Sequence, residues 1–130
     1  MERVIGVGGI FFKSQDPEKL REWYRKHLGF EVEDWGGVIF QEGTGASLAP
    51  RRQFHIVWSP FQADTEYFAP SEKPFMINFR IHDLHAFLAQ LRTAGVQVDE
   101  KTEESEFGKF GWLMNPEGNR IELWEPPELR

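Results

Sequence analysis

The chain has 130 residues, and its 15 Lys and Arg against 21 Asp and Glu give a net charge of −6. This length is typical of one domain, and a hydrophobic content of 40% excludes a disordered chain. The absence of cysteine excludes a thiolate nucleophile, a thiolate-bound metal and a disulfide. The acidic balance disfavours nucleic acid, and no apolar run reaches the ~20 residues that a membrane span needs. We therefore expect a cytoplasmic protein whose partners are small molecules and other proteins.

The first half of the chain predicts a strand, a helix and further short strands. An apolar, glycine-rich segment at 4–13 indicates a buried strand. Asp16 followed by Pro17 predicts a helix start, and apolar residues then recur three and four positions apart as far as Gly29, which predicts the helix end. Short strands are expected at 30–32, 38–41 and 54–59, with glycine turns at 36–37 and 43–45.

The second half repeats this pattern after a proline-rich connecting segment at 60–74. Residues 75–81 predict a strand, a helix is expected from Asp83 to Gly95, and 96–98 alternate as in a strand. The acidic residues 98–106 are expected to form a solvated strand end and loop. Residues 107–114 and 119–124 predict a closing hairpin around Asn115-Pro116-Glu117-Gly118.

The two halves therefore form an internal repeat, in which the helix-capping aspartates and the helix-ending glycines recur at nearly equal spacing. We predict an α+β fold in which two tandem βαβββ modules form a curved mixed sheet with a concave ligand-binding face. The single domain spans 1–130, with modules at 4–59 and 75–125 joined by 60–74. Alternating side chains of each strand should face the helices or the concave side.

The repeat, the segment from Asp16-Pro17 to Gly29-Phe30 and the stretch from Asn115 to Leu123 resemble the vicinal oxygen chelate superfamily. This superfamily includes glyoxalase I, extradiol dioxygenases, and fosfomycin and bleomycin resistance proteins. The resemblance covers essentially the whole chain and implies a glyoxalase-like fold. It does not select one reaction, because the superfamily hosts several.

The resemblance also implies positions for a divalent metal on the concave face. They fall on Gly9, Met76 and Glu122, with a fourth between His55 and Trp58, and only Glu122 offers a suitable ligand among the first three. A catalytic metal normally has about three protein ligands. We therefore predict no cofactor; a divalent metal, if bound, would be held by Glu122 and His55.

Glu122 has two further possible roles. The first is a hydrogen bond to Arg120 or Arg80, which would satisfy a buried charge. The second is catalysis, with Glu122 as a general base.

The predicted concave face combines apolar and polar side chains, as an organic-ligand pocket requires. The aromatic residues, 15% of the chain, divide between this face and the core, where we expect Trp23, Phe79 and Phe87. Candidate ligand-binding residues are Phe11, Lys13, His55, Trp58, Asn78, Arg80, Trp112, Arg120 and Trp124.

Two functions fit these features. One is metal-independent binding of a small aromatic or anionic molecule, like that of the bleomycin resistance proteins. The other is a metal-dependent lyase, isomerase or dioxygenase of the glyoxalase type that uses Glu122. A homodimer is expected by analogy, because edge strands of such modules often pair between chains.

Overall fold

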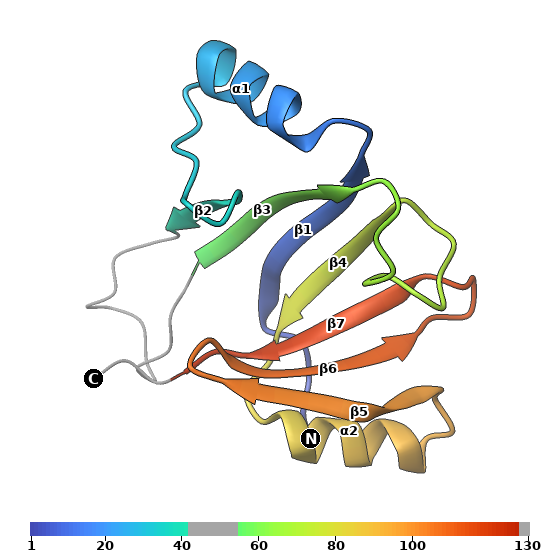
Figure 1. Ribbon diagram of the computed structural model, residues 1–130. Helices are drawn as coiled ribbons and strands as arrows, with labels where there is room; N and C mark the ends of the chain where they lie inside the picture. Colours follow the sequence, from blue (N-terminus) through green and yellow to red (C-terminus); the bar gives the residue numbers. More distant parts are fainter. Residues whose placement is uncertain (42–54, 128–130) are drawn as a thin grey trace.

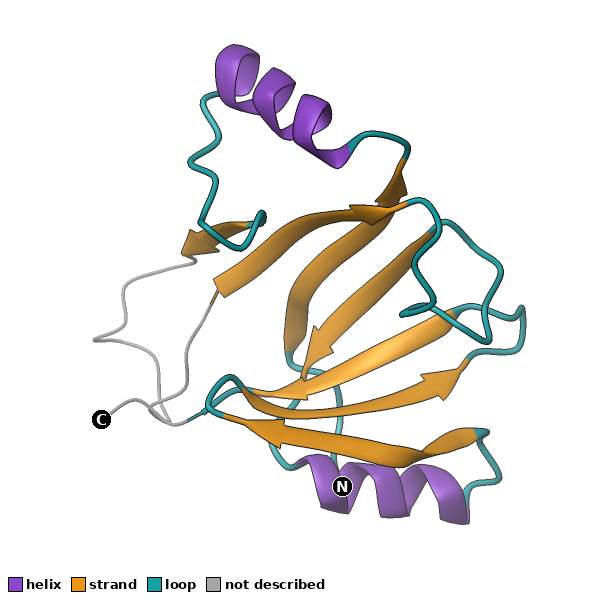
Figure 2. Ribbon diagram, in the orientation of Figure 1, coloured by secondary structure: helices purple, strands orange, loops and turns teal. Residues whose placement is uncertain are grey.

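The computed structural model describes residues 1–41 and 55–127, and its seven strands form one curved sheet (Figure 1). The strands are β1 (Gly6–Ser14), β2 (Val38–Gln41), β3 (His55–Gln62), β4 (Phe75–Arg80), β5 (Val98–Ser105), β6 (Gly108–Met114) and β7 (Arg120–Glu125), and the helices are α1 (Pro17–Leu28) and α2 (Leu84–Thr93). Figure 2 shows the sheet with α2 packed along one side and α1 at the far end. The predicted α+β fold with a curved mixed sheet is confirmed.

The strands follow the order β2-β3-β1-β4-β7-β6-β5 across the sheet. The two halves of the chain meet where β1 pairs antiparallel with β4. On either side of this seam the pairing is parallel, β1 with β3 and β4 with β7, and each outer pair is antiparallel. The first strand of each half therefore lies at the centre of the sheet.

The helix starts are confirmed. The Asp16 side chain accepts a hydrogen bond from the Lys19 amide (3.1 Å), and the Asp83 side chain accepts one from the Ala86 amide (3.1 Å). These bonds satisfy amide groups that have no partner within the helix. After α1, Gly29 adopts the left-handed conformation (φ 71°) that the sequence predicts for a helix end.

Several expected strands differ from the structure in place or extent. Residues 30–32 form no strand, because Phe30 packs its ring against Tyr24 and Trp58 instead of joining the sheet edge. The acidic segment is strand β5 as far as Ser105, since pairing with β6 satisfies its backbone while its charges face water. Strand β3 continues to Gln62, inside the predicted connecting segment. The predicted turn at 43–45 and Phe54 lie outside the described residues.

The sheet has a separate core on each face. On the convex face α2 covers a cluster that includes Ile81, Leu88 and Leu123. On the concave face Met76 and Trp112 pack against Phe68, which comes from the connecting loop at 63–74. This loop covers part of the concave face, and it gives that face a buried interior.

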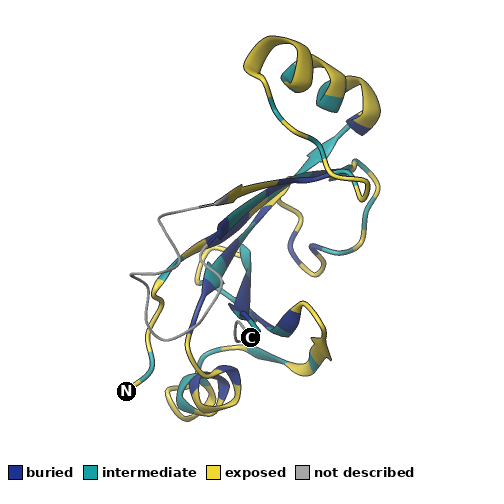
Figure 3. Ribbon diagram, turned by 90° about the vertical axis from the view of Figure 1, so that its left-hand side faces the viewer, coloured by how far each residue is buried: buried dark blue, intermediate teal, exposed yellow. Residues whose placement is uncertain are grey.

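Helix α1 covers much less of the sheet than expected. Figure 3 shows most of α1 as exposed, and only Pro17 of this helix is buried. Trp23 is 51% exposed, so its predicted place in the core is wrong, whereas Phe87 of α2 is buried in the core as predicted. Neither helix within the described residues is long and apolar enough to cross a membrane.

Candidate binding site on the concave face

Glu122 lies at the centre of the concave face because of the strand register. Asn78 on β4 and Trp112 on β6 are its direct partners on the two neighbouring strands. Side chains that share a register position on adjacent strands point to the same face of a sheet. The register therefore places an amide, a carboxylate and an indole side by side.

Three neutral groups donate hydrogen bonds to the Glu122 carboxylate. Oε1 accepts from Asn78 Nδ2 (2.7 Å), and Oε2 accepts from the Tyr67 hydroxyl (2.5 Å) and from Trp112 Nε1 (2.8 Å). Glu122 is 1% exposed, and burial raises the pKa of its carboxyl, an effect that these three hydrogen bonds and the positive charge of Arg120 oppose. The site thus holds a buried carboxyl that takes up a proton more readily than an exposed one.

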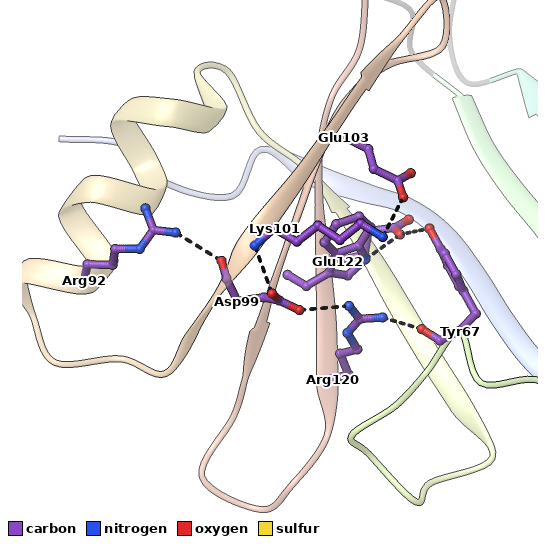
Figure 4. Close-up of polar contacts among 8 residues, drawn as sticks. Tyr67, Arg92, Asp99, Lys101, Glu103, Arg120 and Glu122 are labelled. Carbon is purple, nitrogen blue, oxygen red and sulfur yellow. Dashed lines mark hydrogen bonds and ion pairs between the residues drawn. The ribbon is translucent and has the colours of Figure 1, made fainter.

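Tyr67 is the donor to Glu122 that the sequence did not reveal. It belongs to the connecting loop, where no periodic pattern marks it, and burial next to Glu122 raises the pKa of its hydroxyl, which therefore stays protonated as a donor. Arg120 holds this part of the loop by donating a hydrogen bond to the Tyr67 carbonyl, and its other end lies 3.4 Å from Asp99 (Figure 4). The expected pairing of Arg120 with Glu122 is wrong, because the guanidinium binds these two oxygens instead.

An aromatic cleft of about 360 Å³ opens beside Glu122 on the concave face. Its walls come from β1, β3, β6, β7, the connecting loop and the turn after α1. The described residues that line it are Phe11, Trp35, Val57, Ser59, Pro60, Phe61, Tyr67, Phe110 and Glu122. The rings of Phe11 and Phe61 are 5.5 Å apart, and those of Phe61 and Tyr67 are stacked at 5.6 Å. Predicted residues Phe11 and Glu122 thus come together here with four aromatic residues that were not among the candidates.

Four further candidates lie on the concave face but do not line this cleft. Arg80 is buried and donates a hydrogen bond from Nη1 to the His55 carbonyl (3.2 Å). The His55 ring packs 5.0 Å from Trp124, and burial together with the Arg80 charge lowers the pKa of His55. Lys13 lies 5.9 Å from the centre of the Phe68 ring.

Trp58 lies on the opposite face from the cleft, so its predicted placement in the cup is wrong. In β3 the alternate residues Val57 and Ser59 line the cleft, and Trp58 points the other way. Its ring packs against Tyr24 of α1 (4.7 Å) and against Phe30 (5.0 Å). Trp58 therefore attaches α1 to the sheet.

The described residues of the concave face do not fit a divalent metal. No group of three or more His, Asp or Glu close enough to share an ion occurs in the described part of the chain. Met76 is fully buried against Phe68 and Trp112, and Gly9 offers no ligand atom. The carboxylate that would remain, Glu122, already accepts three hydrogen bonds, which leaves about one of its four acceptor positions open.

Comparison with solved structures identifies the fold. A methylmalonyl-CoA epimerase from Mycobacterium tuberculosis matches with a TM-score of 0.60 and 20% identity over 95% of this chain and 89% of that one. A variant of the Streptomyces coelicolor methylmalonyl-CoA epimerase matches with a TM-score of 0.65 and 19% identity over 98% and 100%. A glyoxalase/bleomycin resistance protein/dioxygenase superfamily member from Vibrio splendidus 12B01 matches with a TM-score of 0.57 and 14% identity over 96% and 99%. At these identities the likeness shows the fold.

The sequence itself gives the family. No curated protein matches the chain. The family model described as "Glyoxalase/Bleomycin resistance protein/Dioxygenase superfamily" matches residues 10–123, a span that contains both helices, all seven strands in whole or in part, and Glu122. The chain therefore belongs to the glyoxalase/bleomycin resistance protein/dioxygenase superfamily, as its motifs predicted.

Proposed function

We propose that this protein binds a small aromatic molecule in the aromatic cleft and that it does so without a metal, like the bleomycin resistance branch of its superfamily. The observation that carries the proposal is the hydrogen bonding of the Glu122 carboxylate. Its carboxylate is occupied by Tyr67, Asn78 and Trp112, which are hydrogen-bond donors, where a metal site would have further ligands.

The shape and lining of the cleft support binding of an organic molecule. A volume of about 360 Å³ falls within the range of small-molecule sites, and such sites are mostly apolar with a few polar groups. Here the apolar part is a set of rings, and the polar part is Glu122 with the Tyr67 hydroxyl. An anionic ligand, which the sequence left open, gains no support, because no Lys or Arg is among the described lining residues.

Two measurements on the full chain test this proposal. After dialysis against a chelator, calorimetric titration with Ni²⁺, Zn²⁺, Mn²⁺ and Fe²⁺ should show no tight stoichiometric uptake. Small aromatic compounds should perturb the fluorescence or the indole NMR signals of the protein, and a Phe61→Ser variant should bind them more weakly. Tight binding of one metal ion per chain would contradict the metal-independent form of the proposal.

A second candidate is an enzyme that uses Glu122 for proton transfer, in the manner of a lyase, isomerase or dioxygenase. The raised pKa of the Glu122 carboxyl favours it, because a carboxyl that keeps its proton closer to neutral pH can act as a general acid. The structurally similar epimerases belong to this general class. If the wild-type chain converts a glutathione hemithioacetal or a catechol and Glu122→Gln is equally active, this role fails.

We also propose a cytoplasmic homodimer. Apolar side chains on the convex side of the β1–β4 seam support a second copy as a partner, since Ile10 is 46% and Phe75 is 39% exposed. Light scattering after gel filtration measures the mass, and a species of 15.2 kDa at all concentrations would contradict the dimer.

A further inference from the structure

Resting on the proposed binding in the aromatic cleft, we propose that the ligand is an organic cation, specifically an aromatic compound that carries an ammonium group. In this arrangement the ammonium group lies against Glu122, and the aromatic part lies among the rings of Phe11, Phe61 and Phe110.

The charge that the cleft can carry is negative. Glu122 is the sole acidic or basic side chain among the described residues that line it. Two basic residues of the concave face have partners outside the cleft. Arg120, whose charge also acts on Glu122, binds Asp99 and the Tyr67 carbonyl, and Lys13 lies against Phe68. A cationic ligand would therefore supply the positive partner that this buried carboxylate lacks within the cleft.

The hydrogen bonds of Glu122 leave room for an ammonium donor. An ionised carboxylate has about four acceptor positions, and three of them are used by Tyr67, Asn78 and Trp112. Oε1 accepts a single bond, so it can accept one more. One position suffices for an ammonium N–H, whereas it does not complete a metal site.

Two rings of the concave face already contact a cation. The Arg120 guanidinium lies 4.8 Å from the centre of the Trp112 ring and 5.9 Å from the centre of the Tyr67 ring. Aromatic faces attract cations through their quadrupole, and most strongly where water is excluded. The rings of Phe61 and Tyr67 are stacked on each other, and both residues line the cleft. The net charge of −6 also attracts cations from solution.

The test compares three soluble probes that share a phenyl ring: 2-phenylethylammonium, 2-phenylethanol and phenylacetate. Binding to the full-length wild-type protein at neutral pH is followed by the indole N–H signal of Trp112, whose nitrogen donates to Glu122. The cation should bind about tenfold or more tightly than the alcohol, because it adds a charge-assisted bond and a cation–π contact. The anion should bind more weakly than the alcohol.

Two variants assign the preference to this cleft. Glu122→Gln should reduce binding of the cation to the level of the alcohol, whereas Glu117→Gln, the same change at an exposed turn, should leave it unaltered. Because a glutamine amide next to three donors can destabilise the fold, Phe110→Leu provides a second variant. This substitution removes one aromatic ring from the cleft wall. It should weaken binding of the cation more than binding of the alcohol.

The outcomes separate this inference from the proposed function. If the cation and the alcohol bind equally well, or if the anion binds most tightly, the inferred cationic ligand is wrong, but the proposed small-molecule binding stands. A cation preference that persists in both cleft variants also overturns the cationic ligand. If none of the three probes binds, both proposals fail.

Discussion

The hydrogen bond between Tyr67 and Glu122 offers a direct test of the site, because its strength depends on the charge of the carboxyl. The Tyr67→Phe substitution removes the hydroxyl that donates to Oε2 at 2.5 Å. The ring stays in place, stacked on Phe61 at 5.6 Å and edge-on to Trp112 at 6.3 Å. The substitution therefore changes one donor and little of the packing.

The expected loss of stability follows from the type of hydrogen bond. A bond to a charged acceptor contributes about 1.5–3 kcal/mol, and a bond between neutral groups contributes about 0.5–1.5 kcal/mol. Tyr67→Phe should thus lower the free energy of unfolding by about 2 kcal/mol where Glu122 is ionised and by about 1 kcal/mol where it is protonated. Because the lost bond favours the ionised form, the pKa of Glu122 should rise further in the variant.

The sign of the pH dependence is fixed by the raised pKa. Burial makes the folded protein hold the Glu122 proton more tightly than the unfolded chain does. The stability that this carboxyl contributes is therefore fully present below its pKa in the unfolded chain, and it is lost as the pH rises through its pKa in the folded protein. The loss is larger in Tyr67→Phe, so the difference in stability between wild type and variant should widen as the pH rises.

Urea unfolding, followed by tryptophan fluorescence at a series of pH values, measures this difference. Tyr24→Phe is the matched control, since Tyr24 is the other tyrosine of the chain and packs against Trp58 on the opposite face. Its effect should not depend on pH in the same way. A stability difference for Tyr67→Phe that is constant over the whole pH range would refute a hydrogen bond to a titrating Glu122.

Two further substitutions test the close packing of the cup and the corrected position of Trp58. A Cβ at Gly8 would lie 2.2 Å from Oδ1 of Asn78. Gly8→Ala should therefore lower the free energy of unfolding by about 1–3 kcal/mol and weaken probe binding. The control is Gly111→Ala on the α2 side of the sheet, which should leave probe binding unchanged. Trp58→Ala should lower the free energy of unfolding by about 3–5 kcal/mol, because Trp58 packs against Tyr24 of α1. The affinity for the probes should stay within about twofold of that of the wild type. Denaturant unfolding and titration of the three phenyl probes measure both effects, and loss of probe binding in folded Trp58→Ala would contradict its position on the convex face.

The sequence predicts most of the fold because its signals are local. Asp16 and Asp83 cap the helices through bonds to amides three residues away, and Gly29 takes the left-handed conformation required at its helix end. Such features do not depend on distant parts of the chain. The predicted strand at 30–32 fails for the converse reason: its alternation is local, but a strand also needs a neighbour, and Phe30 packs on an aromatic cluster instead.

The candidate site is harder to predict because it depends on register and on a loop. A shift of one residue moves a strand side chain to the other face, and this explains why Trp58 was expected in the cup and lies under α1. Tyr67 reaches Glu122 from a loop with no periodic pattern. Arg120 and Glu122 lie on the same face of β7, yet Arg120 binds Asp99 and the Tyr67 carbonyl. These partners are distant in sequence, so strand alternation does not predict them.

The cationic ligand and the buried carboxyl together predict a proton linkage that a neutral ligand lacks. A cation binds the ionised form of Glu122, so below the raised pKa of this carboxyl each binding event should release one proton. The titratable and charged groups that act on it are Tyr67 from the connecting loop and Arg120 from β7. Affinity for 2-phenylethylammonium should therefore increase with pH, by at most about tenfold per unit, and become constant above the pKa. Calorimetry in buffers of different ionisation enthalpy counts the protons, with 2-phenylethanol as the probe that should release none. Equal proton release for the two probes would mean that the ammonium group does not contact Glu122.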